Sequence, residues 1–430
     1  MSVWEQYSQE QRDDYIKYLQ VYGALSNLFQ QKQGRLIPYL DSKFQETVFA
    51  KIFSSENVDI GNTPHDVLSI LNGKRIGIGL KTWMNSGPSF QKVMQLKRYQ
   101  NEIESCKHNL ADLAYMISAI KNNRMKSDYE RLGLTESNNI YHYITRDEGL
   151  FSIHECPYPL IQLDKIRILK GTSSSFSWTD GIKDYKFTYG DAQVWQNFDS
   201  EKYSTLTLDR FNIKIIEDPF SFLLKAYFDQ IETVKEVHQD IVEVYLPLYS
   251  YKTGEVQNKS GLNAWNGSSK SKGSDVLRPL NEVYISIPIA FHHKYPNFFT
   301  QDILQVINAR KNFKGNKSYR PEVRFHLQLP NGNKIPALVT QDNMKGLQSG
   351  STTEIDPSTG KCFGQSALGQ WLLVDVLGLK DRTLVTREWL AKKETDSVRL
   401  WRKKDEYSII NIDFAPLNAF EEFMDGHNTI

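Results

Sequence analysis

The spacing of apolar residues divides the first part of the chain into helices and a hairpin. Over residues 3–33, apolar side chains recur at intervals of three and four, which predicts an amphipathic helix; they are Trp4, Tyr7, Tyr15, Leu19, Tyr22, Leu25 and Phe29. Further helices are predicted over residues 38–53 and 90–124. Between them, residues 66–83 read as two short strands around Asn72-Gly73, a dipeptide that closes hairpins.

A strand-rich segment and one more helix complete this part of the chain. Residues 140–189 have the apolar pattern of strands, with turn signals at Asp147-Glu148-Gly149 and Asp180-Gly181. A helix predicted over residues 221–234 then leads into the charged stretch EVHQD. We therefore expect a domain boundary near Val237, with one domain over residues 1–237 and a second over residues 238–430.

The second domain has a different pattern, with many short strands and little helix. The predicted strands include a hairpin around Asn331-Gly332, and one short helix is predicted over residues 369–379. The other strands are predicted at 241–250, 281–289, 397–404 and 406–414. Short strands with a helix between them favour a barrel-like domain, so we expect an α+β protein of more than one domain.

The composition is that of a globular protein and does not by itself indicate a class of function. The chain has 430 residues, of which 40% are hydrophobic and 24% charged, as in ordinary globular proteins. Residues 241–430 contain 24 Lys and Arg against 20 Asp and Glu, a slight basic excess that weakly favours a polyanionic partner.

The cysteines and the apolar runs of the chain predict whether it binds zinc and in which cellular compartment it lies. Three widely separated cysteines, Cys106, Cys156 and Cys362, argue against a zinc cluster and fit a reducing compartment. The polar N-terminus and the lack of an apolar run of about 20 residues predict a cytoplasmic protein without a membrane partner.

The hairpin carries the residue types that metal-dependent phosphodiester cleavage needs. Asp66 opens it and Lys81 lies late in its second strand. A carboxylate can hold Mg²⁺ against a scissile phosphate, and a nearby lysine can orient water and stabilise developing charge. Glu46, on the preceding predicted helix, is the candidate for a second metal-binding carboxylate, and Gln95, on the following predicted helix, is a further catalytic candidate.

This layout resembles the PD-(D/E)XK nuclease core. Pro64-His65-Asp66 stands where that family has its PD, and Gly79-Leu80-Lys81 stands where it has (D/E)XK. The resemblance implies an N-terminal α/β nuclease domain that uses Mg²⁺. The chain departs from the motif at Gly79, which occupies the acidic position, so the missing carboxylate would come from elsewhere, with Glu46 as the first candidate.

A second resemblance covers roughly residues 240–414. The segments SGLN, RPLNEVYISIP and FHLQLPNGNKIPALVTQDNMKG look like the B-three-like DNA-recognition domain of NgoFVII-type restriction endonucleases, a pseudobarrel also present in BfiI and EcoRII. The resemblance implies two arms that enter the major groove, where amides read adenine and arginine or lysine reads guanine. It places one arm at Asn263, Trp265, Asn266 and Arg278, and the other at Gln341, Asn343 and Lys345.

The basic run ARKNFKGNKSYRPEVR supplies candidate phosphate contacts, above all Lys314 and Lys317. The two resemblances together imply a type II restriction endonuclease that cuts double-stranded DNA. They also imply a homodimer and a cognate DNA methyltransferase in the same system, without a stable complex between the two. Two alternatives stay open: a DNA-binding regulator with a degenerate nuclease domain, and an endonuclease that depends on modified cytosine.

Overall fold

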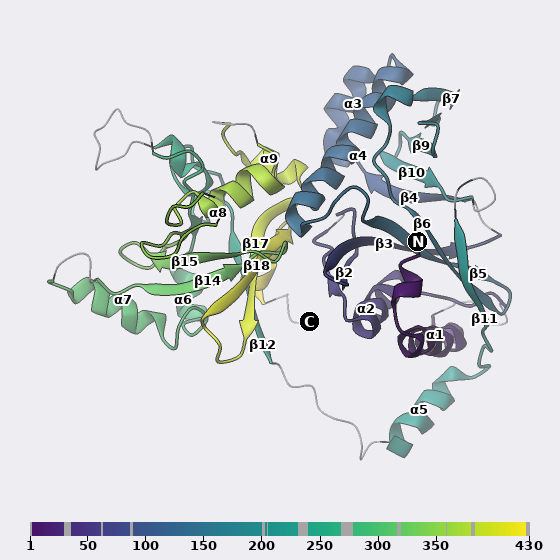
Figure 1. Cartoon of the computed structure of the whole chain (residues 1–430), viewed down its shortest axis with the longest axis horizontal. Helices are drawn as coiled ribbons and strands as arrows, with labels where there is room; N and C mark the ends of the chain where they lie inside the picture. The colour runs from purple at the N-terminus through teal and green to yellow at the C-terminus, as the bar shows by residue number, and fades with distance from the viewer. Residues whose placement is uncertain are drawn as a thin grey trace. The chain divides into compact units, whose positions relative to one another are not determined.

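The structure is a computed structural model, and it describes residues 2–29, 36–61, 63–86, 89–199, 203, 205–230, 240–267, 278–315, 320–357, 359–379 and 383–426. The chain divides into two compact units, Met1–Val237 and His238–Ile430. Helices and sheets occur together in each unit, so the fold is α+β (Figure 1). Among the described residues, no helix is long and apolar enough to cross a lipid bilayer.

The first unit is built on a six-stranded sheet in the order β1-β2-β3-β5-β6-β11. Neighbouring strands are antiparallel except β3 and β5, which run parallel. The hairpin predicted around Asn72-Gly73 is present as β2 and β3. The strands are β1 (Glu56–Asn57), β2 (Val67–Leu71), β3 (Lys74–Met84), β5 (Asn139–Asp147), β6 (Leu150–Pro157) and β11 (Leu206–Asn212).

Helices cover both faces of this sheet. On one face, Tyr15 of α1 and Phe49 of α2 pack with Ile78 and Leu80 of β3 in one core. On the other face, Met125 of α4 packs in a second core with the aromatic residues of β5. The helical elements are η1 (Trp4–Gln6), α1 (Gln9–Ala24), η2 (Ser26–Leu28), α2 (Ser42–Phe53) and α4 (Leu110–Leu132).

A second, antiparallel sheet packs on the N-terminal half of α4, in the order β4-β10-β9-β8-β7. Leu113 and Ile117 of α4 share a core there with Trp178 and Phe187, so α4 contributes to two cores. The remaining elements are β4 (Phe90–Gln95), η3 (Lys97–Tyr99), α3 (Gln100–Cys106), η4 (Leu163–Lys165), β7 (Arg167–Gly171), β8 (Ser175–Thr179), β9 (Asp184–Thr188), β10 (Gln193–Asn197) and α5 (Pro219–Gln230).

The helix predicted over residues 90–124 is wrong at its start. Phe90–Gln95 forms strand β4, because these residues pair with β10. The α-helix begins only at Gln100, after the 3-10 turn η3, and α3 ends at Cys106 before α4 begins at Leu110. The second predicted helix starts at Ser42 rather than residue 38, because Asp41 accepts hydrogen bonds from the N–H groups of Lys43 and Phe44 at 2.9 and 3.1 Å.

The second unit is a seven-stranded, barrel-like sheet in the order β12-β17-β18-β14-β15-β16-β13. All neighbours are antiparallel except β14 and β18. The end strands β12 and β13 contact each other, so the sheet is nearly closed. The strands are β12 (Ile241–Pro247), β13 (Ile285–Ser286), β14 (Val323–Gln328), β15 (Lys334–Thr340), β16 (Gly346–Ser349), β17 (Thr395–Lys403) and β18 (Ile409–Pro416).

Short helices surround this sheet. The helix predicted over residues 369–379 is present as α8 followed by a π-helical turn, and Trp371 and Leu372 of that turn are buried. These elements are η6 (Gly261–Asn266), α6 (Ile289–Lys294), α7 (Ile303–Asn312), α8 (Ala367–Gly369), η8 (Gln370–Val376), α9 (Arg387–Lys392) and α10 (Ala419–Asp425).

Candidate active site and candidate DNA-binding loops

Asp66 and Lys81 lie beside each other at the open end of the β2–β3 hairpin. The backbone of Asp66 is fixed because its N–H donates to Ile78 O at 3.0 Å and its carbonyl accepts from Val58 N at 3.0 Å. Its Oδ2 accepts the Leu80 N–H at 2.5 Å and lies 3.5 Å from Lys81 Nζ. Both side chains keep some exposure, 13% for Asp66 and 27% for Lys81, so the pair can meet a ligand.

Lys81 and Gly79 lie on the same face of β3, because alternate residues of a strand point the same way. A Cβ placed at Gly79 would lie 2.9 Å from ring atoms of Tyr141 and 3.3 Å from the ring of Tyr158. These two stacked rings, 3.8 Å apart at their centroids, fill the space that a carboxylate at position 79 would need.

Glu46 of α2 lies close enough to Asp66 for their negative charges to interact. Burial raises its pKa, and the negative charges of Asp66 and Asp59 raise it further, against the opposing hydrogen bond from Lys43. Lys43 Nζ lies 2.7 Å from Glu46 Oε2 and 3.3 Å from Asp59 Oδ2. Lys43 and Asp59 were not among the residues expected from the sequence. The signal that could have found Asp59 is a second aspartate in the short loop before Asp66.

Gln95 does not lie on a helix, contrary to the prediction. It is the last residue of β4 in the five-stranded sheet, where it pairs with Gln193, and its Nε2 donates to Asp191 O at 3.1 Å. The helix on which its catalytic role was predicted does not exist at this position.

A buried ion pair lies directly under the segment that carries Asp66. His65 Nδ1 is 2.7 Å from Asp128 Oδ2, and the His65 backbone N–H donates to the same oxygen at 3.3 Å. Arg131 Nε donates to Asp128 Oδ1 at 2.8 Å. Burial raises the pKa of Asp128, but Arg131 and His65 outweigh it and leave the pKa lowered. The network therefore ties the start of β2 to α4.

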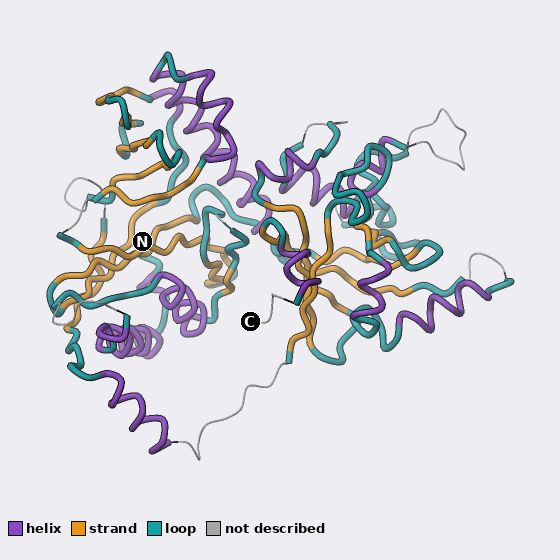
Figure 2. Tube along the Cα trace, turned by 180° about the vertical axis from the view of Figure 1, so that it is seen from behind, coloured by secondary structure: helices purple, strands orange, loops and turns teal. Residues whose placement is uncertain are grey.

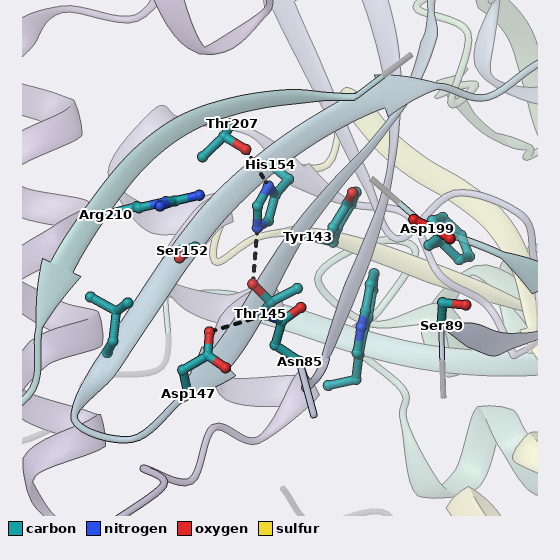
Figure 3. A pocket seen from close by; sticks show the side chains of 13 residues that line it. Asn85, Ser89, Tyr143, Thr145, Asp147, Ser152, His154, Asp199, Thr207 and Arg210 are labelled. Carbon is teal, nitrogen blue, oxygen red and sulfur yellow. Dashed lines mark hydrogen bonds between the residues drawn. The ribbon is translucent and has the colours of Figure 1, made fainter. Parts of the chain in front are cut away.

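A cavity of about 330 Å³ opens on the same face of β3 as Lys81. Trp83, two residues beyond Lys81, stacks on Tyr143 with ring centroids 4.6 Å apart, and Tyr143 stacks on His154 at 4.8 Å. These three rings from three neighbouring strands line the cavity. Figure 3 shows Arg210 on one side of it and Asp199 on the other.

His154 belongs to the wall of the cavity rather than to its reactive groups. Its Nε2 is 2.9 Å from Thr145 Oγ1 and its Nδ1 is 3.1 Å from Thr207 Oγ1 (Figure 3). Burial, with the positive charge of Arg210, lowers its pKa to about 4. His154 is therefore neutral at pH 7, and the charges that face the cavity come from the carboxylates and from Arg210.

In the second unit, the first predicted arm contains residues that are buried and have a structural role. Asn263 is fully buried, and its amide exchanges two hydrogen bonds of 2.9 Å with the backbone of Val385. Trp265 is also buried. Asn266 donates to Asn258 O at 2.9 Å. Asn263 and Trp265 therefore have no exposed surface for a base edge in this arrangement.

Arg278 and the second predicted arm are accessible. Arg278 is partly exposed and lies 2.8 Å from Glu282 Oε1. The second arm is the loop between β15 and β16, with Gln341 and Asn343 partly exposed and Lys345 exposed. The pairing of Ser286 with Gly346 places strand β13, which follows Arg278 in the chain, beside this loop.

The predicted phosphate contacts follow α7. Lys314 is exposed, whereas Lys317 lies outside the described residues. Arg320 forms an ion pair of 2.9 Å with Asp342 in the second arm, so the basic segment and the second arm are neighbours.

Within the described ranges, no three acidic, histidine or cysteine side chains converge closely enough to hold a metal ion by themselves. The candidate site thus consists of Asp66 and Lys81 with Glu46 nearby, beside a polar cavity, in a unit separate from the barrel-like one. Compared with known proteins, the chain matches no protein-family model and no curated protein.

Proposed function

We propose that the chain is a Mg²⁺-dependent, site-specific endonuclease of restriction type, in which the first unit cuts double-stranded DNA and the second recognises it. The observation that carries the proposal is the contact between Asp66, just before β2, and Lys81 of β3. Lys81 Nζ lies 3.5 Å from Asp66 Oδ2, and both side chains are partly exposed. An aspartate and a lysine at the open end of a hairpin are the pair that the resemblance to PD-(D/E)XK nucleases implies.

The residues present fit a single Mg²⁺ ion. Mg²⁺ is usually bound through one or two carboxylates, with water and substrate phosphate completing the shell. Asp66 would hold it, with Glu46 as the second carboxylate. Burial raises the pKa of Glu46, and the negative charges of Asp66 and Asp59 raise it further, as expected for carboxylates that lie close together. When bound, the ion would lower the pKa of a water and offset phosphate charge.

Lys81 supplies the other part of the chemistry. Its Nζ donates to Leu80 O at 2.8 Å, which holds the ammonium group beside Asp66. From there it would orient the attacking water and stabilise the charge that develops on the phosphate oxygens. The cavity beside Trp83 leaves room for the adjoining nucleotide, with Arg210 available to a phosphate.

Recognition is assigned to the second unit. Gln341, Asn343 and Arg278 are the proposed base readers, because amides and guanidinium groups form bidentate pairs with adenine and guanine. Lys314 and Lys345 are exposed and would contact phosphates, which position the protein without reading sequence.

Cleavage of phage DNA with Mg²⁺, and with EDTA as the chelated control, tests the proposal. Asp66→Asn and Lys81→Met should each lower the cleavage rate by at least about 10²-fold, because each removes a group that acts on the transition state. Both variants should still shift duplex DNA in a gel. The matched control is Lys74→Met, an exposed lysine at the turn end of the same strand, which should cut normally.

Discrete bands with Mg²⁺ and none with EDTA are the expected result. Wild-type rates from either site variant would show that the site lies elsewhere. One observation favours a second candidate, a DNA-binding regulator: Tyr141 and Tyr158 occupy the space of the missing acidic side chain at Gly79. That candidate predicts gel shifts with no cleavage under any metal.

A further inference from the structure

The start of helix α5 is held to the rest of the first unit by hydrogen bonds. Before it, Ile216 N donates to Ala24 O at 2.8 Å, and Asn27 Nδ2 donates to Ile216 O at 2.9 Å. Asp218 Oδ1 then accepts the N–H groups of Phe220 and Ser221 at 3.1 and 3.2 Å, which caps the helix. Beyond these hydrogen bonds, Figures 1 and 2 draw α5 projecting away from the rest of its unit.

One face of α5 is apolar and uncovered. Its residues follow the spacing i, i+3, i+4, i+7, i+8, which forms a single stripe along a helix. We name it the α5 stripe; its members and their exposed fractions are Phe220 57%, Leu223 39%, Leu224 61%, Tyr227 52% and Phe228 63%. A stripe of this kind normally faces a core, and exposed apolar patches mark interaction sites.

We propose that the α5 stripe is a homodimer contact, packed against the same stripe of a second copy of this chain. Aromatic side chains each have about 150–250 Å² to bury, and the three in the stripe are more than half exposed. With the two leucines, a pair of stripes would bury on the order of 1,000 Å², the lower limit of a specific interface. A twofold pair brings identical patches together, so a second copy matches the stripe in length and character.

If the chain is the proposed endonuclease, this dimer contact explains how both DNA strands are cut. Each chain has one candidate site of Asp66 and Lys81, and one site cuts one strand at a time. Since α5 belongs to the unit that carries this site, pairing through α5 supplies two sites to one duplex. The contact itself is argued from the exposure of the stripe and stands without cleavage.

The test is the mass of the full chain in solution, measured by light scattering and sedimentation over a wide range of protein concentration. The wild type should have twice the mass of one chain. The double variant Leu224→Lys/Phe228→Lys should have the mass of one chain, with an unchanged circular dichroism spectrum because both residues are exposed. The matched control is Phe222→Lys on the same helix, 49% exposed but outside the stripe, which should remain dimeric.

A monomeric wild type at every concentration, or a dimeric double variant, overturns the proposal. If the wild type is monomeric and its α5 amides are protected from hydrogen exchange, the stripe packs within one chain. If it is monomeric and binds neutral lipid vesicles through α5, the stripe is a membrane contact. The mass measurement needs neither DNA nor metal, so a dimer that never cuts DNA removes the proposed function and leaves the contact.

Discussion

At the scale of single residues, the side chains around position 79 explain why an acidic residue is not accommodated there. A carboxylate at Gly79 would meet the ring of Tyr141, which stacks on Tyr158. Tight cores resist added atoms at a cost of about 1–3 kcal/mol. The candidate carboxylate from another element is Glu46 of α2, whose pKa is raised by burial and by the negative charge of Asp66.

Lys121 of α4 lies close to the same rings and offers a test at this scale. Its ammonium group is buried, donates to Met125 Sδ at 3.2 Å and lies 4.7 Å from the centre of the Tyr158 ring. Burial lowers its pKa to about 7, with Asp180 opposing the shift. In the unfolded chain the pKa returns to 10.5, so unfolding takes up a proton between these two values.

The sign of the effect follows from this proton uptake. Between pH 7 and 10.5 the unfolded state binds more protons than the folded state, so the wild type gains stability as the pH rises. The variant Lys121→Met has no such group and keeps the volume. It should therefore exceed the wild type in stability by a few kcal/mol at pH 7, since each pKa unit is worth about 1.4 kcal/mol.

The measurement is urea unfolding at several pH values from 6 to 10, a range of roughly four units around the lysine transition. The advantage of Lys121→Met should shrink steadily toward pH 10. Lys126→Met, at an exposed position of the same helix, should show no pH-dependent difference. A variant less stable than the wild type at pH 7 would mean that the Tyr158 contact outweighs the burial of charge.

At the scale of elements, α4 holds the open end of the β2–β3 hairpin in place. His65, Asp128 and Arg131 form a buried network that links this helix to the residue before Asp66. Breaking a buried pair leaves an uncompensated charge, which costs about 3–5 kcal/mol. We predict a loss of this size for Asp128→Asn, measured by urea unfolding, with Glu130→Gln on the exposed side of α4 as the neutral control.

The same variant should also affect acid stability. The pKa of Asp128 is lowered in the folded state, net of burial, so its contribution is present above the unfolded pKa of about 3.9 and is lost as the pH falls through the folded value. The gap between wild type and Asp128→Asn should therefore close in strong acid. A gap that is constant down to the lowest pH would place the stabilisation outside this carboxylate.

At the scale of the whole molecule, the division after Val237 allows the two units to be separated. We predict that a fragment of residues 238–430 folds alone, because its nearly closed sheet has its own core. It should bind duplex DNA with an affinity that falls as salt rises, by about 0.9 log units per phosphate contact per log unit of salt. Fluorescence anisotropy at two salt concentrations measures this, and Lys314→Ala should reduce the slope by about one.

The complementary fragment of residues 1–237 is the control for that experiment, since it lacks the proposed reading loops. A folded second fragment that fails to bind at low salt would remove the recognition role from the barrel-like unit. Tight binding by the first fragment alone would move recognition into the unit that carries Asp66.

The sequence by itself determined the features that depend on local pattern. The hairpin around Asn72-Gly73 follows from a turn dipeptide between apolar runs, and so does the hairpin of β14 and β15 around Asn331-Gly332. The strand predicted over residues 281–289 is wrong over most of its length, because only Ile285 and Ser286 pair with β16 and helix α6 begins at Ile289. The stripe on α5 is also a local pattern, since its spacing is visible in the sequence. In these cases neighbouring residues contain the deciding interactions.

Only the tertiary structure decided what depends on contacts between distant segments. Phe90–Gln95 is a strand because β10 pairs with it, and Asn263 is buried because Val385 binds its amide. The meeting of Asp66 with Lys81 rests on the register that pairs Val67 with Ile78. The exposure of the α5 stripe also could not be predicted from the sequence, because the spacing of residues defines a face of a helix but not what covers that face.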